Sequence, residues 1–345
     1  MKKILIQVSG LGEGKLFNPD ARDASLEPGI YLRDRLKERG YQLETADDKS
    51  VEDCSWIWFW DFFEKYELEN PLLRIIKNLK HVLKGKRQQV KMRDLYEDCV
   101  RAGKQDRIGL FIWEAPAISR VTWNPKVHDL FQTILTWNDN YVDGKKFHKF
   151  CFPVPSYFPN VPEISFKKKK LLVNISGNKS SSRSRELYSA RRKTIRYFER
   201  KHPDQFDLYG IGWDQLKKGQ RSYPSYRGPV KHKWDVYPSY RFGVCYENMR
   251  DEPGYITEKV FDCMRADSVP IYWGASNITD YVDAEAFIDR RRFKSDAELE
   301  SFLVSVTESE YEKYRQAIKS YLASDRFAAF LPPAFANTII RVFQL

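Results

Sequence analysis

Short apolar runs alternate with longer segments of helical periodicity along the second half of the chain. The order is clearest over residues 240–275, YRFGVCYENMRDEPGYITEKVFDCMRADSVPIYWGA. This segment predicts a buried strand over 242–246, a Gly-containing loop, a helix that Thr257 caps, and a second buried strand over 269–273. The same alternation predicts the other elements of this half: strands over 171–176 and 206–209, and helices over 185–201, 296–306 and 308–323.

The first half of the chain alternates in the same way. It predicts strands over 3–8, 55–60, 109–113 and 133–137, a glycine loop at 10–14, and helices over 29–39, 71–83 and 94–102. Strands that alternate with helices imply parallel sheets covered on both faces. Because prolines cluster between residues 153 and 162, as they do in linkers, we expect two α/β domains, 1–160 and 161–345, facing each other across a cleft.

The lengths of the apolar runs and the spacing of the cysteines indicate the cellular compartment of the protein. No apolar run approaches the ~18 to 20 residues of a membrane-spanning helix, and the apolar stretch near the N-terminus is shorter than the ~7 to 15 residues of a secretory signal. The five cysteines lie far apart and form no C-x-x-C pair, which is typical of a reducing compartment. We therefore expect a cytoplasmic protein, either soluble or peripheral at the inner face of a membrane.

The positive charge of the chain is concentrated in one segment. Residues 167–201 contain thirteen Lys and Arg against Glu186 and Glu199, which equals the net charge of the whole chain, +11. A solvated basic helix face accounts for most of these side chains. The functional interpretations are attraction to an anionic nucleotide, contact with an anionic membrane surface, or binding to nucleic acid.

The predicted helix that begins at Thr257 would form an anion site. Its first N–H groups and Lys259 both favour negative charge beyond the carboxyl end of the preceding strand, and a diphosphate fits such a site. Glu258 suits a hydroxyl-bearing group such as a sugar. Two residues that border the loop, Asn248 and Tyr255, are candidates for hydrogen bonds to the same ligand. The structural alternatives are helix-dipole compensation by Glu258, a solvated Lys259, and turn formation by the two loop residues.

One arginine lies in the apolar stripe of the predicted helix over 185–201. On a helical projection, Arg191 falls within about 80° of arc together with Leu187, Ile195 and Phe198, whereas Arg192 lies at the border of this stripe. An inward guanidinium needs an anionic partner. Either a phosphate or a buried carboxylate would satisfy it.

Glu114 is the candidate general base, because it follows a predicted buried strand, at the sheet edge where α/β folds bind ligands. A loop charge or a helix cap is the structural alternative. The five histidines show no metal-ligand spacing, and the chain contains no D-x-D triplet, so we expect no metal site. The charge of a diphosphate would then be neutralised by Arg191, Lys259 and the helix N-terminus.

These motifs resemble those of the α-1,3/1,4-fucosyltransferases, glycosyltransferase family 10. The resemblance is dense in YRFGVCYEN and GYITEKVFDCMRADSVPIYWGA, and looser in SYRGPVKHKWDVYPSYRF, ELYSARRKTIRYFER and FIDRRRF, so that it covers about residues 165–290. FIWEAP is similar to the family's Glu-Ser-Pro motif, with Ala115 in place of the serine. The first hundred residues match no pattern that we can name.

The resemblance implies a soluble, bacterial-type enzyme of the GT-B type, with two Rossmann-like domains. An N-terminal domain would bind an oligosaccharide or glycan acceptor, and a C-terminal domain would bind the donor, GDP-fucose. Fucose would move from GDP-β-L-fucose to an acceptor hydroxyl with inversion, and no cofactor or metal would be required. The partners are then the sugar nucleotide and the acceptor, without nucleic acid.

The resemblance also implies roles for individual residues. It assigns the base to Glu114 and the diphosphate to Arg191 and Lys259. It implies that ribose or fucose is contacted by Asn248, Tyr255 and Glu258. It also implies that Lys233 lies near the nucleotide. Two other interpretations stay open: a glycosyltransferase of the same fold that uses a different nucleotide sugar, and a protein that binds nucleic acid or an anionic surface.

Overall fold

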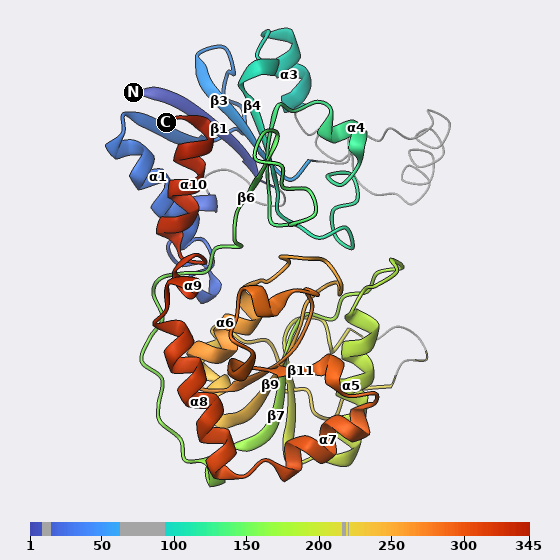
Figure 1. Ribbon diagram of the computed structural model, residues 1–345. Coiled ribbons are helices and arrows are strands. Elements are labelled where there is room, and N and C mark those ends of the chain that lie inside the picture. The colour runs from blue at the N-terminus through green and yellow to red at the C-terminus, as the bar shows by residue number, and fades with distance from the viewer. Residues whose placement is uncertain (9–14, 63–93, 216–218, 220) are drawn as a thin grey trace. The chain divides into compact units, whose positions relative to one another are not determined.

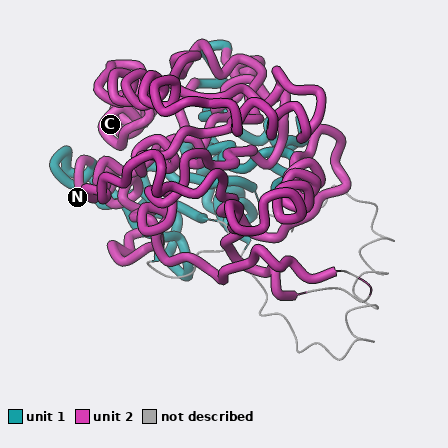
Figure 2. The backbone as a smooth tube through the Cα atoms, turned by 90° about the horizontal axis from the view of Figure 1, so that it is seen from below, with its two compact units in different colours: residues 1–16, 36–136, 143–148 teal, residues 17–35, 137–142, 149–345 magenta. Residues whose placement is uncertain are grey.

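The computed structural model describes the chain except for residues 9–14, 63–93, 216–218 and 220 (Figure 1). The glycine loop predicted at 10–14 and the helix predicted over 71–83 lie outside the described residues. The chain divides into two compact units (Figure 2): unit 1 comprises 1–16, 36–136 and 143–148, and unit 2 comprises 17–35, 137–142 and 149–345.

The two units are discontinuous in sequence, unlike the expected continuous domains 1–160 and 161–345. The segment 17–35 belongs to unit 2 although it lies near the N-terminus. Two contacts tie it there: the backbone N–H of Lys233 donates to Asp23 Oδ1 at 2.8 Å, and the N–H of Tyr157 donates to Glu27 Oε2 at 3.1 Å. Local sequence patterns carry no information about contacts between residues so far apart in the chain.

Unit 1 is built on a sheet of strand order β2-β1-β3-β4-β5-β6. The pairs β1–β2, β1–β3, β3–β4 and β4–β5 are parallel, as predicted. The strands are β1 Lys2–Val8, β2 Tyr41–Thr45, β3 Cys54–Trp60, β4 Ile108–Ile112, β5 Thr133–Thr136 and β6 Phe147–Lys149, with helices α3 Leu95–Arg101 and α4 Pro125–His128. All the predicted strands of this half are confirmed. Strands β2 and β6 were not predicted.

Unit 2 contains a second sheet, of order β11-β10-β9-β7-β8, with parallel pairing throughout. Its strands are β7 Lys170–Ile175, β8 Phe206–Tyr209, β9 Tyr240–Tyr246, β10 Val269–Trp273 and β11 Ile288–Asp289. The helices are α5 Tyr188–Lys201, α6 Glu258–Arg265, α7 Asp296–Ser305, α8 Glu308–Leu322, α9 Asp325–Ala328 and α10 Pro332–Phe343, and α1 Glu27–Glu38 begins in the N-terminal segment. The predicted elements occur in the predicted order, and β11 was not predicted.

Helices α5 and α6 lie on opposite sides of this second sheet (Figure 1), and the alternation of side chains along β9 shows why. Tyr246 points toward α5, where its hydroxyl lies 3.2 Å from Thr194 Oγ1. Gly243 has the opposite orientation and faces α6. A Cβ at Gly243 would lie 2.6 Å from Cys263 Sγ and 2.8 Å from the Tyr237 ring, so the close approach of α6 requires glycine here.

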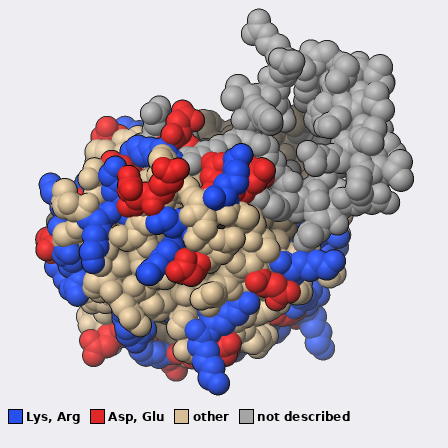
Figure 3. Space-filling model, turned by 90° about the horizontal axis from the view of Figure 1, so that it is seen from above, with Lys and Arg blue, Asp and Glu red and all other residues tan. Residues whose placement is uncertain are grey.

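Part of the basic segment 167–201 is neutralised within unit 2. Lys169 pairs with Asp267 at 2.7 Å, Lys170 with Asp207 at 2.6 Å, and Arg196 with Glu199 at 2.6 Å. The positive charge of the sequence therefore overstates the charge that this segment presents to solvent. Figure 3 shows one face of the molecule, on which acidic and basic side chains are interspersed.

Among the described residues, no helix combines the length and the apolar character that crossing a bilayer would require. No disulfide joins the five cysteines, all of which lie among the described residues, and Cys245 and Cys263 are buried together in a cluster between β9 and α6.

Candidate functional site

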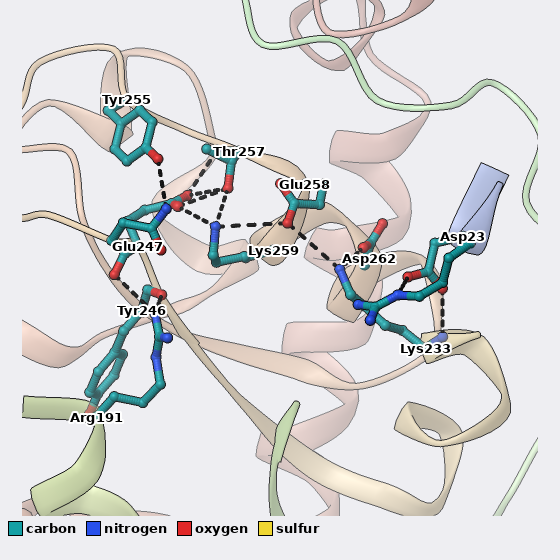
Figure 4. Close-up of polar contacts among 12 residues, drawn as sticks. Asp23, Arg191, Lys233, Tyr246, Glu247, Tyr255, Thr257, Glu258, Lys259 and Asp262 are labelled. Carbon is teal, nitrogen blue, oxygen red and sulfur yellow. Dashed lines mark hydrogen bonds and ion pairs between the residues drawn. The ribbon is translucent and has the colours of Figure 1, made fainter. Parts of the chain in front are cut away.

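The carboxyl end of β9 and the start of α6 form the centre of the candidate site (Figure 4). β9 ends at Tyr246, and the next residue, Glu247, has a fully buried side chain. Its carboxylate accepts hydrogen bonds from the Thr257 N–H at 2.8 Å and from the Thr257 hydroxyl at 2.8 Å. The strand end is thus joined to the helix start by one buried carboxylate.

Thr257 occupies the N-cap position of α6, with extended backbone angles, but its side chain makes no capping bond to the helix. The predicted N-cap position of Thr257 is confirmed, but the capping hydrogen bond expected of its side chain is not formed. The hydroxyl donates to Glu247 and accepts from Lys259 Nζ at 2.9 Å. The first-turn N–H groups of α6 are consequently left without that side-chain partner, at the positive end of the helix dipole.

Lys259 lies between two carboxylates. Its Nζ is 3.0 Å from Glu247 Oε2 and 3.7 Å from Glu258 Oε1, and its side chain is 22% exposed. Burial lowers the pKa of Lys259, but the two carboxylates outweigh burial and raise the pKa above its usual value. The ammonium is therefore charged and held in place at the site.

Glu258 bridges two lysines, since its Oε1 lies 3.7 Å from the Nζ of both Lys233 and Lys259. Burial raises the pKa of Glu258, but the two lysines outweigh burial and lower the pKa to about 2. Its side chain is 36% exposed. An ionised, partly exposed carboxylate of this kind can accept hydrogen bonds from hydroxyl groups of a ligand.

Lys233 lies on the flank of α6 and is buried. Its Nζ contacts Asp262 Oδ2 at 2.6 Å, and its pKa is raised because the neighbouring carboxylates outweigh the opposing effect of burial. Its backbone N–H is the donor to Asp23 described above. The structure thus links Lys233 to the candidate site through Glu258 (Figure 4).

Arg191 is buried on the inner face of α5, as the helical projection predicts. Its Nη2 donates to the backbone carbonyls of Tyr246 at 2.5 Å and Glu247 at 3.1 Å, and burial lowers its pKa. Within the described part of the chain, no ion pair to a carboxylate satisfies this guanidinium. The alternative arginine, Arg192, instead donates to the Lys179 carbonyl at 2.7 Å at the border of the helix.

The loop between β9 and α6 holds the other two predicted contact residues. Asn248 Nδ2 donates to the Tyr255 hydroxyl at 3.1 Å, and the buried Tyr255 ring packs against Trp137 with centroids 4.5 Å apart. Gly254 has φ +79°, and a Cβ there would lie 2.2 Å from the Trp137 carbonyl oxygen. The segment 137–142 therefore fixes this loop within unit 2.

Glu114 lies in unit 1, two residues after β4 ends. Its backbone N–H donates to the buried Asp61 carboxylate, at 3.1 Å to Oδ2 and 3.3 Å to Oδ1, and its carbonyl accepts from Trp123 Nε1 at 2.8 Å. The side chain is partly exposed. Its role as general base stays a prediction.

Two site residues were missed in the sequence. Glu247 directly follows β9, and Asp61 directly follows β3. Both obey the rule that selected Glu114, a carboxylate at the end of a buried strand, so the signal was present. Glu247 was not predicted because the ligand contacts at this strand end were assigned to Asn248 and to the start of the helix.

No cluster of three His, Cys, Asp or Glu side chains suited to a metal ion occurs among the residues that the structure describes. The expectation of a reaction without a required metal or cofactor stays a prediction. The cationic groups that the site offers are Arg191, Lys233 and Lys259.

Two units with parallel α/β sheets are typical of the GT-B fold. Over residues 165–329, a little under half of its length, the chain matches the family model described as "Glycosyltransferase family 10 (fucosyltransferase) C-term". The resemblance indicated by the sequence motifs is thereby confirmed for this segment. This segment contains every candidate site residue except Glu114.

Individual relatives show the same likeness. An alpha-(1,3)-fucosyltransferase of Helicobacter pylori is 33% identical over 66 residues, which cover 19% of this chain and 14% of the relative. An alpha-(1,4)-fucosyltransferase of Arabidopsis thaliana is 39% identical over 82 residues, which cover 22% of this chain and 20% of the relative. The matches thus span no more than about a fifth of the relatives' own length.

Solved structures share the fold. A crystal structure of an alpha1,3-fucosyltransferase aligns with a TM-score of 0.58 at 12% identity, over 100% of this chain and 91% of that one. One with GDP-fucose aligns with a TM-score of 0.53 at 14% identity, over 100% and 90%. A T4 phage BGT in complex with UDP and Mn2+ aligns with a TM-score of 0.55 at 13% identity, over 100% of both chains. At such identities the likeness shows the fold, which confirms the GT-B prediction.

Proposed function

We propose that this protein transfers L-fucose from GDP-β-L-fucose to a hydroxyl of an oligosaccharide acceptor, in α-1,3 or α-1,4 linkage. The observation that carries the proposal is the family match over residues 165–329, which contain the buried Glu247–Lys259 pair at the helix start. The relatives described above are fucosyltransferases, and one structural neighbour holds GDP-fucose.

In this proposal Lys259, Arg191 and the first turn of α6 bind the diphosphate. The ammonium is already held by Glu247, so little side-chain freedom is lost when a phosphate binds beside it. Charge-assisted hydrogen bonds of this kind contribute about 1.5–3 kcal/mol each. A neutral ligand would gain none of this electrostatic attraction.

The sugar and ribose hydroxyls bind to polar groups around the same helix start. Glu258 accepts hydrogen bonds as an ionised carboxylate, and Asn248 and Tyr255 present an amide and a phenol that already contact each other. Lys233 lies close to the nucleotide by virtue of its contact with Glu258. Each role follows from the hydrogen-bonding capacity of the side chain.

The transfer is a single displacement with inversion. The acceptor oxygen forms a bond to C1 of fucose, the bond between C1 and the β-phosphate oxygen breaks, and GDP leaves with the electron pair. The acceptor hydroxyl gives its proton to Glu114, and the product is an α-fucoside. Positive groups at the diphosphate stabilise the leaving group without a required metal ion.

A second candidate function keeps the fold and changes the donor. The T4 phage structure with UDP shares the fold, so the fold by itself admits more than one nucleotide sugar. Measured turnover of GDP-fucose, GDP-mannose and UDP-sugars separates the two functions. We expect turnover with GDP-fucose, and preference for any other donor would favour the second candidate.

The nucleic-acid alternative has less support, because Lys169, Lys170 and Arg196 of the basic segment are paired with acidic partners. It predicts salt-dependent binding to DNA or RNA and no response to sugar nucleotides. A cytoplasmic location with contact to an anionic membrane face stays a prediction.

The decisive experiment concerns Glu114. We expect Glu114→Ala to bind GDP normally and to transfer fucose about 10²- to 10⁴-fold more slowly, because a general base contributes that much. Glu97→Ala, at an exposed glutamate of α3, is the matched control and should leave both unchanged. Retained transfer by Glu114→Ala would remove the base from this proposal.

A further inference from the structure

A buried carboxylate at the end of β3 holds the backbone of the proposed base. Asp61 is 3% exposed and directly follows β3. Its Oδ1 accepts the N–H of Trp113 at 3.0 Å, and its Oδ2 accepts the N–H of Glu114 at 3.1 Å. Its own backbone N–H donates to the Phe111 carbonyl at 2.8 Å, which fixes it to β4. Asp61 thus connects the end of β3 to the end of β4 beside Glu114, the proposed base.

The arrangement at Asp61 is costly to the fold. The backbone of Asp61 has φ +60°, in the left-handed region that L-residues other than Asn and Asp seldom adopt. Burial raises the pKa of its carboxyl to about 8, against the opposing effect of the backbone hydrogen bond from Trp113. Strained backbone and buried ionisable groups concentrate at functional sites, where the surrounding structure supports them.

Glu114 is held on its other side by an indole. Trp123 Nε1 donates to the Glu114 carbonyl at 2.8 Å. The N–H and the C=O of Glu114 are therefore both bound by side chains from other segments, whereas its own carboxyl group is on the partly exposed side chain. Binding both backbone groups restricts the torsions at Glu114 and so the direction in which the side chain leaves the main chain.

We propose that Asp61 is a positioning residue for the reaction: it accepts the N–H groups of Trp113 and Glu114 and so aims the Glu114 carboxylate at the acceptor hydroxyl. This inference rests on the proposed function, in which Glu114 is the base. Asp61 takes no proton from the substrate and acts through Glu114. A displacement of about 1 Å at a catalytic group can cost about 10²-fold in rate, so fixing this backbone has a large kinetic effect.

The test is a double-mutant cycle between Asp61 and Glu114, with transfer measured at saturating donor and acceptor. Asp61→Ala is expected to lower kcat by about 10- to 100-fold and to leave the Kd for GDP unchanged. Asp61→Asn should recover kcat to within about threefold, because the amide oxygen can still accept both N–H groups. In the Glu114→Ala background, Asp61→Ala should cause no further loss, since it acts through the missing carboxylate.

The outcomes separate this inference from the proposed function. If Glu114→Ala keeps full transfer, the proposed function loses its base whatever Asp61 does. If Glu114→Ala loses transfer while Asp61→Ala keeps the wild-type kcat, or lowers kcat equally in both backgrounds, the positioning role is overturned and the base stands. Should Asp61→Ala not fold, Asp61→Ser replaces it, because its shorter side chain does not span both N–H groups, and the same comparisons decide.

Discussion

The carboxylate of Glu247 holds the ammonium of Lys259, with Oε2 3.0 Å from Nζ, and both lie in the segment that matches the family model. Glu247 also accepts both hydrogen bonds of Thr257. One buried acid therefore sets the position of the proposed phosphate-binding cation and the first turn of α6. Removing either Glu247 or Lys259 should therefore have a measurable effect.

Removing the acid should destabilise unit 2. Glu247→Ala leaves the Lys259 charge and the Thr257 donors without their partner, and breaking a buried pair in this way costs about 3–5 kcal/mol. Glu247→Gln keeps an acceptor oxygen and should cost less. Urea unfolding measures both, with Glu285→Ala at an exposed glutamate as the control. Equal stability of Glu247→Ala and the control would show that the pair contributes little to the fold.

Removing the cation should weaken the binding of the diphosphate specifically. Lys259→Met is expected to lower GDP affinity by about 10- to 100-fold, in line with the loss of one charge-assisted hydrogen bond. Guanosine carries no phosphate, and its affinity should stay within about twofold. Calorimetric titration measures both ligands, and Lys193→Met, at an exposed lysine of α5, controls for net charge. Equal losses for GDP and guanosine would assign Lys259 to a role other than phosphate binding.

The two adjacent arginines of α5 should behave differently. Arg191 is buried against the carbonyls that follow β9, whereas Arg192 contacts the Lys179 carbonyl at the helix border. Arg191→Met is therefore expected to lower both GDP affinity and melting temperature, and Arg192→Met to change GDP affinity by less than about twofold. Titration with GDP compares the two variants directly. A larger loss for Arg192→Met would make Arg192 the phosphate-binding arginine.

Asp61 should make the stability of the protein depend on pH. Its pKa of about 8 in the folded state exceeds that of an unfolded aspartate, about 3.9. Between these values the folded protein binds more protons than the unfolded chain, so stability falls as pH rises from about 4 to about 8. At about 1.4 kcal/mol per pKa unit, the loss amounts to several kcal/mol at most.

Asp61→Asn removes the titrating group and should flatten this part of the pH profile. Melting temperatures at pH 5 and pH 8.5 are the measurement, and Asp106→Asn, at an exposed aspartate of unit 1, is the control. A drop in melting temperature of the same size in Asp61→Asn as in the unmodified protein would place the pH dependence elsewhere.

Helical periodicity was sufficient to predict the inward position of Arg191, because the apolar stripe that contains it faces the core. The same local reasoning placed Thr257 correctly at the N-cap but did not predict the contacts of its hydroxyl. In an isolated helix the hydroxyl oxygen would accept a first-turn N–H, whereas here it accepts from Lys259 Nζ and the O–H donates to the buried Glu247, ten positions earlier in the chain. Local propensity yields to tertiary contacts when a buried charge needs donors.

The features of the fold that the sequence did not predict depend on contacts between distant segments. Strand β2 was missed because it is a short, half-buried edge strand that pairs with β1 alone. The division of the chain was missed because Asp23 and Lys233, 210 positions apart, must be known to meet before residues 17–35 can be assigned to unit 2. No pattern within a window of helical or strand length reports such a pairing.

The hydrogen bond from Lys233 to Asp23 also constrains how the molecule is made. During synthesis Asp23 leaves the ribosome long before Lys233, 210 positions later, so the early segment must wait without its partner while unit 1 is translated and folds. A recombinant fragment limited to the family segment, residues 165–329, would lack Asp23 altogether. Such a fragment would contain the proposed donor-binding residues but would expose the flank of α6 that the N-terminal segment normally covers.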